Sequence, residues 1–384
     1  MHPNTTRWAS LLAPLALMAG ACSTDYFAFE HGNSTRISNF NNGDSSVKVR
    51  RPGYALTMQS EGQVTFTDDE SDVASLEAKG RFELAETIGG VLREYIVEAD
   101  RSGALSREYF FEGESTPMDD AAKQWLAAAL PRMFRESGFD VEARIVRLLA
   151  RGGPERVLQE VNLATSDYAK ASYLGRLLET TPLDAAQADL ALASASKIDS
   201  DYELRRALNQ ALHTQSLDAK RLSLLLTTGR QIDSDYELTE LLLEAMERLP
   251  ADAEPLSAWL DAARQLDSDY ELGRAIEAGL KHCDEDAAFT ARLIQLGADQ
   301  LESDYELGQI LKRVAHRKVD AALASAYLDA VGSLDSDYER RNALEAIAPS
   351  VVSDAELNRR YRELARTMSD YERGQALKAL DDAM

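Results

Sequence analysis

The sequence has almost no cysteine and too few basic residues to balance its acids. Two cysteines, Cys22 and Cys283, occur in 384 residues, so a fold built on several disulfides is excluded. Lys and Arg number 42 against 65 Asp and Glu, which gives a formal net charge of −23. Nucleic-acid binding needs clustered basic side chains that displace counterions from phosphates. The charge balance therefore argues against a nucleic-acid partner and is compatible with a cationic one.

Sequence signatures of catalysis are also missing. The five histidines form no H-x-x-x-H or H-E-x-x-H pair, and no G-x-S-x-G, Walker or G-x-G-x-x-G motif occurs. Residues 282–286 (HCDED) are the densest run of metal-capable side chains, but adjacent residues rarely point toward one ion. Carboxylate pairs occur throughout and do not indicate a glycosidase. The sequence thus predicts a protein that is not an enzyme and needs no cofactor or metal.

The first 21 residues have the features of an export signal. Arg7 gives a positive start, Trp8 to Met18 form an apolar stretch too short for a comfortable membrane span, and Ala-Gly-Ala precedes Cys22. This segment resembles the signal of bacterial lipoproteins, in which the cysteine is acylated. The resemblance implies a lipid anchor on Cys22 and, from Ser23, an outer-membrane protein facing the periplasm. Ala19 stands where leucine is usual, and an ordinary signal peptidase would instead leave a soluble periplasmic or secreted chain.

Composition divides the rest of the chain. Residues 22–36 are polar and predict a tether. Residues 37–113 contain short runs of β-branched and aromatic residues with partial period-two alternation, which predict a small antiparallel β domain with one solvated face. Residues 114–164 predict a helical bridge, interrupted at Gly152-Gly153-Pro154. From residue 165 to 384 the pattern is helical throughout.

A phrase close to LDSDYELG recurs through residues 165–384. Its serines are spaced by 33 to 35 residues, a period that indicates a solenoid. Each serine is expected to cap a helix, with the glutamate three positions later reaching back to the serine amide in a capping box. Apolar residues follow at helical spacing, and a second helix is expected near Asp218 in the second unit. The seven serines are Ser166, Ser200, Ser234, Ser268, Ser303, Ser336 and Ser369.

These units predict a mostly α fold. Each is expected to be two antiparallel helices that must stack on their neighbours, so that about seven repeats of ~34 residues form an α-solenoid after the β domain. The phrase at Ser166 lacks its glutamate and the last unit has one helix before Met384, as expected of capping units. In the sixth unit the second helix is expected to begin with its own capping box, Ser353-Asp354-Ala355-Glu356.

The repeat region resembles α-solenoids of the HEAT or tetratricopeptide type. The unit length matches tetratricopeptides, but their patterned Trp, Gly, Tyr and Pro positions are missing. The SDYE phrases after a β region also resemble exported bacterial proteins and the extracytoplasmic tails of some BlaR-like membrane metallopeptidases, although the peptidase motif is absent here. The resemblance implies a sensing or scaffolding role in the cell envelope.

The recurring tyrosines allow two interpretations. In the first, the rings pack between successive first helices and the neighbouring acids act as helix caps. In the second, the rings and acids form an edge that holds a cationic or sugar-bearing partner through cation–π contacts and long-range attraction. The first is preferred because capping explains every letter except the tyrosine. The candidate edge consists of Tyr202, Tyr236, Tyr270, Tyr305 and Tyr338.

The function expected from these observations is that of a cell-envelope lipoprotein that serves as a protein-interaction scaffold. Its partner would be one or more envelope proteins, bound through the helical repeats. The alternative is an envelope sensor, in which the β domain binds a ligand and the helical array relays the signal to a partner enzyme.

Overall fold

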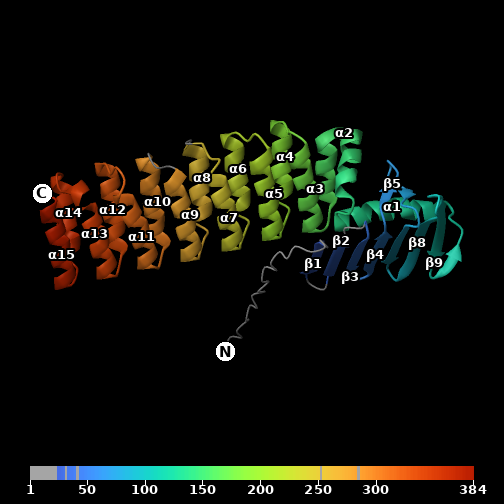
Figure 1. The fold of residues 1–384 in the computed structure, drawn as a ribbon, viewed down its shortest axis with the longest axis horizontal. Helices are drawn as coiled ribbons and strands as arrows, with labels where there is room; N and C mark the ends of the chain where they lie inside the picture. Colours follow the sequence, from blue (N-terminus) through green and yellow to red (C-terminus); the bar gives the residue numbers. More distant parts are fainter. Residues whose placement is uncertain (1–23, 31–32, 40–42, 251–252, 283–285) are drawn as a thin grey trace, which may run out of the picture. The chain divides into compact units, whose positions relative to one another are not determined.

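The computed structural model describes residues 24–30, 33–39, 43–250, 253–282 and 286–384. The expected signal peptide at 1–21 and the expected lipidation of Cys22 lie outside these residues. The chain divides into two compact units between Ser137 and Gly138. The first unit is built on a β-sheet and the second is a helical array (Figure 1).

An eight-stranded antiparallel sheet forms the first unit, with strand order β1-β2-β3-β4-β7-β8-β9-β10. The order follows the chain except that a separate hairpin, β5–β6, is inserted between β4 and β7. This confirms the predicted antiparallel β region. The strands are β1 Thr24–Glu30, β2 Asn33–Asn39, β3 Ser45–Arg51, β4 Tyr54–Glu61, β5 Val64–Phe66, β6 Val73–Leu76, β7 Arg81–Ile88, β8 Val91–Ala99, β9 Leu105–Phe111 and β10 Glu114–Thr116.

The segment expected to be a tether differs from that prediction. Residues 24–30 form β1, and β2 begins at residue 33, so most of the stretch 22–36 belongs to the sheet. The turn-rich composition of residues 22–36 gave no sign of these strands, whose pairing of β1 with β2 and of β2 with β3 is not a local signal. β2 pairs along its length with β3, whose Val47 and Val49 are fully buried.

One face of the sheet is covered by helix α1 (Asp120–Ser137) and by the β5–β6 hairpin. The ring of Phe66 on the hairpin contacts Phe82 on β7 and Phe134 on α1, with centroids 5.5 and 4.9 Å apart. The buried carboxylate of Glu86 accepts hydrogen bonds from Trp125 at 2.8 Å and from Arg132 at 2.8 and 2.7 Å. Helix α1, expected to start a bridge, therefore belongs to the β unit.

The second unit consists of helices α2 to α15. Odd-numbered helices pack on odd-numbered ones and even on even, so successive helix pairs form two layers. This confirms the predicted α-solenoid. The helices are α2 Val141–Leu163, α3 Asp167–Thr180, α4 Ala185–Ala195, α5 Asp201–Thr214, α6 Ala219–Gly229, α7 Asp235–Met246, α8 Ala253–Ala263, α9 Asp269–His282, α10 Ala287–Gln300, α11 Asp304–Ala315, α12 Ala321–Ser333, α13 Asp337–Val351, α14 Ala355–Arg366 and α15 Asp370–Asp382.

Helix α2 is a helix pair in itself. Its backbone leaves the helical conformation at Gly152 and at Gly153, where φ is +65° and glycine is favoured. The helix packs against both α3 and α4, as one repeat packs on the next. It therefore covers the first face of the array, a role the sequence suggested for the unit that begins at Ser166.

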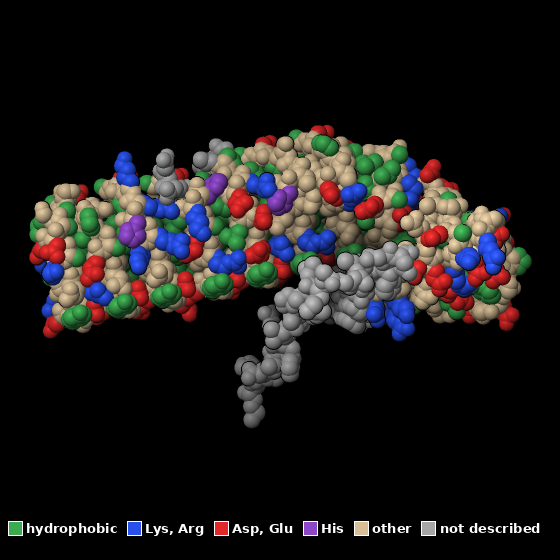
Figure 2. All heavy atoms as spheres, in the orientation of Figure 1, with side chains coloured by type: hydrophobic (Ala, Val, Ile, Leu, Met, Phe, Trp, Pro, Cys, Tyr) green, Lys and Arg blue, Asp and Glu red, His purple; other side chains and the backbone are tan. Residues whose placement is uncertain are grey.

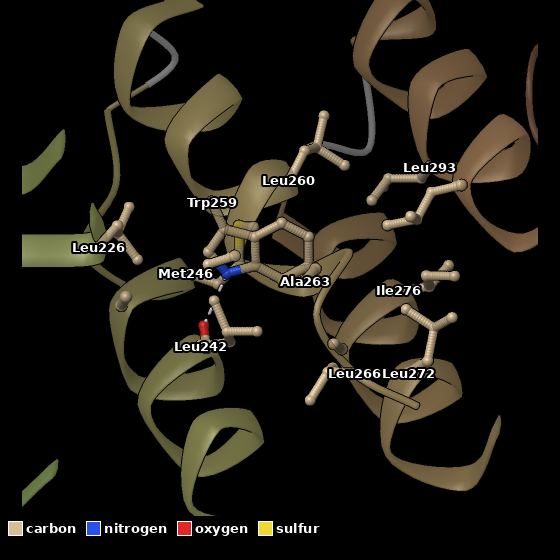
Figure 3. Close-up of a cluster of buried hydrophobic side chains, with 14 of the residues drawn as sticks. Leu226, Leu242, Met246, Trp259, Leu260, Ala263, Leu266, Leu272, Ile276 and Leu293 are labelled. Atoms are coloured by element: carbon tan, nitrogen blue, oxygen red, sulfur yellow. Dashed lines mark hydrogen bonds between the residues drawn. The ribbon is translucent and has the colours of Figure 1, made fainter. Parts of the chain in front are cut away.

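A continuous apolar core runs between the two layers. The residue that opens most of the phrases is buried in this core, and so are the leucines that follow the glutamate. Ile198, Ile232 and Leu272 are 1 to 3% exposed. Trp259 on α8 is fully buried, and its indole N–H donates to the carbonyl of Leu242 on α7 at 2.9 Å (Figure 3). Its ring also contacts Phe289 on α10, so it fills the seam between two units.

Candidate interaction surface

The serines of the phrase lie at the N-caps of the odd-numbered helices. The hydroxyl of Ser166 accepts from the Ala169 amide at 3.1 Å. Ser234, Ser268, Ser303 and Ser336 accept from the corresponding amide at 3.3 to 3.4 Å. Ser200 and Ser369 are N-cap residues whose side chains make no cap bond.

Ser268→Ala tests the energetic value of these caps. Loss of one side-chain bond to a helix amide should lower the free energy of unfolding by about 0.5 to 1 kcal/mol, toward the low end because the bond is long at 3.4 Å. Ser200→Ala is the matched control and should change it by less than about 0.5 kcal/mol, since no cap bond is lost. Equal losses in the two variants, measured by urea unfolding, would contradict this assignment.

The aspartate of each phrase bonds to the next unit. The carboxylate of Asp167 accepts from the backbone N–H of Ser200 at 2.8 Å and from that of Asp199 at 3.0 Å. Six such links join the seven units, and we call the set the aspartate ladder. Its other bonds run from Asp201 to Ser234, Asp235 to Ser268, Asp269 to Ser303, Asp304 to Ser336 and Asp337 to Ser369, at 2.6 to 2.9 Å.

The ladder corrects the predicted capping box. That motif needs the serine backbone N–H as donor to the glutamate, but here this N–H is bonded to the aspartate of the preceding unit. The expectation for the sixth unit is also corrected, because its second helix is capped by Asp354 and not by Ser353.

The glutamates of the phrase mostly pair with arginines. Glu237 pairs with Arg205 of the preceding unit, and Glu372 pairs in the same way with Arg341. Other glutamates pair within their own helix, as Glu203 does with Arg206 at 2.6 Å. Burial raises the pKa of Glu203 despite this arginine. These glutamates therefore form ion pairs between units or within one helix, and they do not complete a capping box.

The tyrosine rings lie at the surface. Tyr202 is 51% exposed and Tyr270 is 65% exposed, with Tyr236, Tyr305 and Tyr338 between these values. The preferred interpretation, in which the rings pack between first helices, is therefore wrong. The reason is helical geometry: in the fourth unit Leu272, two positions after the tyrosine, faces the core at 1% exposure, and this turns Tyr270 outward.

Arginines already contact several of these rings. The guanidinium of Arg205 lies 5.5 Å from the ring centroid of Tyr202, and that of Arg341 lies 5.0 Å from Tyr338. Arg274 lies 6.0 Å from Tyr270. These distances are in the range of cation–π attraction. The exposed rings can therefore bind guanidinium groups.

Grooves lie between successive odd-numbered helices. Three of them, with volumes of about 400 to 540 Å³, are located between α3 and α5, α7 and α9, and α11 and α13. Each contains a histidine, namely His213, His282 or His316. Figure 2 shows Lys, Arg and His side chains in a band along the array. Sequence reasoning missed these grooves, although aligning the repeats on their serines places His213, Lys281 and His316 in one column.

The described part of the chain shows neither a metal site nor a membrane-spanning helix. There, no three His, Cys, Asp or Glu side chains come together as a metal site would need. The run 282–286 falls partly outside the described residues. No described helix combines the length and apolarity needed to cross a membrane.

The fold and this surface define the class of the protein, which is an α-helical repeat protein with a preceding antiparallel β unit. No protein-family model matches the sequence, and neither does any curated protein.

Proposed function

We propose that the helical array is a protein-interaction scaffold whose binding edge is the row of exposed tyrosines Tyr202, Tyr236, Tyr270, Tyr305 and Tyr338, called here the tyrosine row. One observation carries this proposal. The serine, the aspartate that follows it and most of the glutamates of the repeated phrase make contacts within the array, whereas the tyrosine ring is more than half exposed in each of these five units.

The chemistry of the row suits a protein partner. Tyrosine supplies a large rigid surface with a polar end and is enriched in the cores of protein interfaces. The exposed acids Asp199, Asp233 and Asp267 precede the tyrosines by three residues in their units. The net charge of −23 would attract a cationic partner over long range.

We also propose a cellular location for the scaffold. The lipoprotein-like signal supports a lipid anchor on Cys22, which would hold the protein at the outer membrane facing the periplasm. A partner within the cell envelope would then be within reach of the array.

Site-specific photocrosslinking in cells tests the scaffold function. A benzophenone amino acid replaces Tyr270 in the full chain, and Leu224, 37% exposed on the even-numbered helix α6, is the matched control position. The expected result is one dominant adduct from position 270 that weakens when Tyr236 and Tyr305 are changed to Ala. Absence of an adduct with the protein abundant, or the same adducts from both positions, would contradict the proposal.

A further inference from the structure

The repeats contain an internal example of how this surface binds a guanidinium group. In the second unit Arg205 lies three residues after Tyr202, contacts its ring at 5.5 Å, and pairs with Glu237 of the next unit. In the sixth unit Arg341 repeats the arrangement, with the ring of Tyr338 at 5.0 Å and Glu372 as its partner. One arginine thus joins the tyrosine of its own unit to the glutamate of the next.

The fifth unit has the same tyrosine and glutamate with no arginine between them. The residue that corresponds to Arg205 and Arg341 is Gly308. The Glu339 carboxylate lies over it, with an oxygen 2.6 Å from the position that a Cβ on Gly308 would take. Tyr305 is 59% exposed, and no described side chain donates to the Glu339 carboxylate or places a cation over the Tyr305 ring.

Neighbouring units do not share this arrangement. Gly273 also lies beneath a glutamate, Glu306, at 3.4 Å from the equivalent position. There, however, Arg274 covers the ring of Tyr270. In the third unit the tyrosine has no arginine, but the next glutamate, Glu271, pairs with Arg274 at 2.8 Å. Among the described units, only the fifth therefore combines a tyrosine ring that no arginine covers with a glutamate of the next unit that has no ion-pair partner.

A groove of ligand size is present at this place. Its volume is about 540 Å³, and its walls include Tyr305, Tyr338, Gly308 and Glu339. The basic residues Lys312 and His316 also line it. Lys312 lies four residues beyond Gly308 on α11, about 6 Å of helical rise, and among the described residues it makes no ion pair with Glu339.

We propose that the groove between α11 and α13 binds an arginine side chain of the partner protein, with its guanidinium over Tyr305 and paired with Glu339. The proposal rests on the proposed function and names the chemistry of the partner. Arginine is favoured over lysine because its planar group both stacks on an aromatic ring and forms two parallel bonds to a carboxylate.

Peptide titration of the full chain tests this site. The probe is acetyl-Gly-Arg-Gly-amide, and the same peptide with neutral citrulline is its control; binding is followed through amide chemical shifts near Gly308. The arginine peptide should give saturable shifts and bind at least about tenfold more tightly than the citrulline peptide. Glu339→Gln should weaken arginine binding by about tenfold, which corresponds to one lost charge-assisted contact.

Gly308→Arg is the decisive variant because its new side chain would occupy the site from within. It should abolish binding of the arginine peptide while the melting temperature stays equal or rises, since arginine favours a helix more than glycine does. Gly374→Arg is the matched control: it adds the same charge at the equivalent position of the last unit, where a Cβ meets nothing within 4 Å, and should leave binding unchanged. Tyr305→Ala replaces this test if Gly308→Arg does not fold.

Three results would overturn the arginine site: no saturable shift, equal binding of the citrulline peptide, or normal binding by Gly308→Arg. The failure of the site is distinguishable from the failure of the scaffold. An intact crosslink from position 270 alongside any of these results overturns the arginine site alone, whereas loss of that crosslink overturns the proposed function.

Discussion

Asp269→Ala should lower the free energy of unfolding of the array by about 2 to 3 kcal/mol. Its carboxylate accepts from the amides of Ser303 at 2.7 Å and Glu302 at 3.1 Å, both in the next unit. Bonds to a charged acceptor contribute about 1.5 to 3 kcal/mol each when shielded, and partial exposure reduces the sum. The measurement is urea unfolding followed by circular dichroism at 222 nm.

Asp370→Ala is the control for this prediction. Asp370 occupies the same position in the last unit and has the same place at a helix N-terminus, but no further unit follows it within the sequence. Its replacement should cost less than about 1 kcal/mol, the value of a charge near a helix end. Equal losses for the two variants would show that the aspartates act on their own helices and not between units.

Trp259→Ala should cost about 3 to 5 kcal/mol, the range for removing a fully buried large side chain. The indole fills the seam between the third and fourth units and donates to the Leu242 carbonyl (Figure 3). Because each unit is stabilised chiefly by its neighbours, a cavity at a seam weakens coupling along the array. We therefore expect the unfolding transition to broaden or split as well as to shift.

Trp259→Phe separates volume from hydrogen bonding. It keeps an aromatic ring and loses the bond to Leu242, so it should cost about 1 to 2 kcal/mol. Unfolding monitored by circular dichroism distinguishes the two variants. A loss below about 1 kcal/mol for Trp259→Ala would contradict a role for this side chain in the core.

The array could be predicted from the sequence because its signals are local and repeated. The serine at each helix start, the apolar spacing after it and the 33 to 35 residue period all depend on short-range geometry. The strand β1 could not be predicted in this way, because it is defined by its pairing with β2, which a short-range pattern does not reveal. Its neighbour β2 is ordered in turn by β3.

The side-chain contacts of the repeated phrase could not be predicted in the same way. They depend on which residues face the next unit, and the sequence of one unit does not show which these are. Asp167 and Glu203 both look like helix-start acids, and S-x-x-E matches a capping box in sequence. In the structure the backbone N–H of the serine donates a hydrogen bond to the aspartate of the preceding unit. For Ser200 and Asp167 this bond spans 33 residues of sequence. The exposure of Tyr270 also does not follow from the phrase alone, since the direction of its side chain is set by the burial of Leu272.

The serine, the aspartate that follows it and most of the glutamates of the phrase stabilise the array, whereas the exposed tyrosines are proposed to bind a partner. A chain with all five residues of the tyrosine row changed to Ala tests this most directly. Each ring lost from an exposed site should change stability by about 0.5 kcal/mol or less. Lost cation–π contacts at Tyr202, Tyr270 and Tyr338 are offset by the higher helix propensity of alanine.

The measurement is the free energy of unfolding of this variant in urea. The account predicts a folded array within about 2 kcal/mol of the parent chain, which would leave the row available for binding. A loss of about 2 to 4 kcal/mol for each ring, enough to unfold the array, would show that the tyrosines are core residues and would contradict the binding-edge proposal.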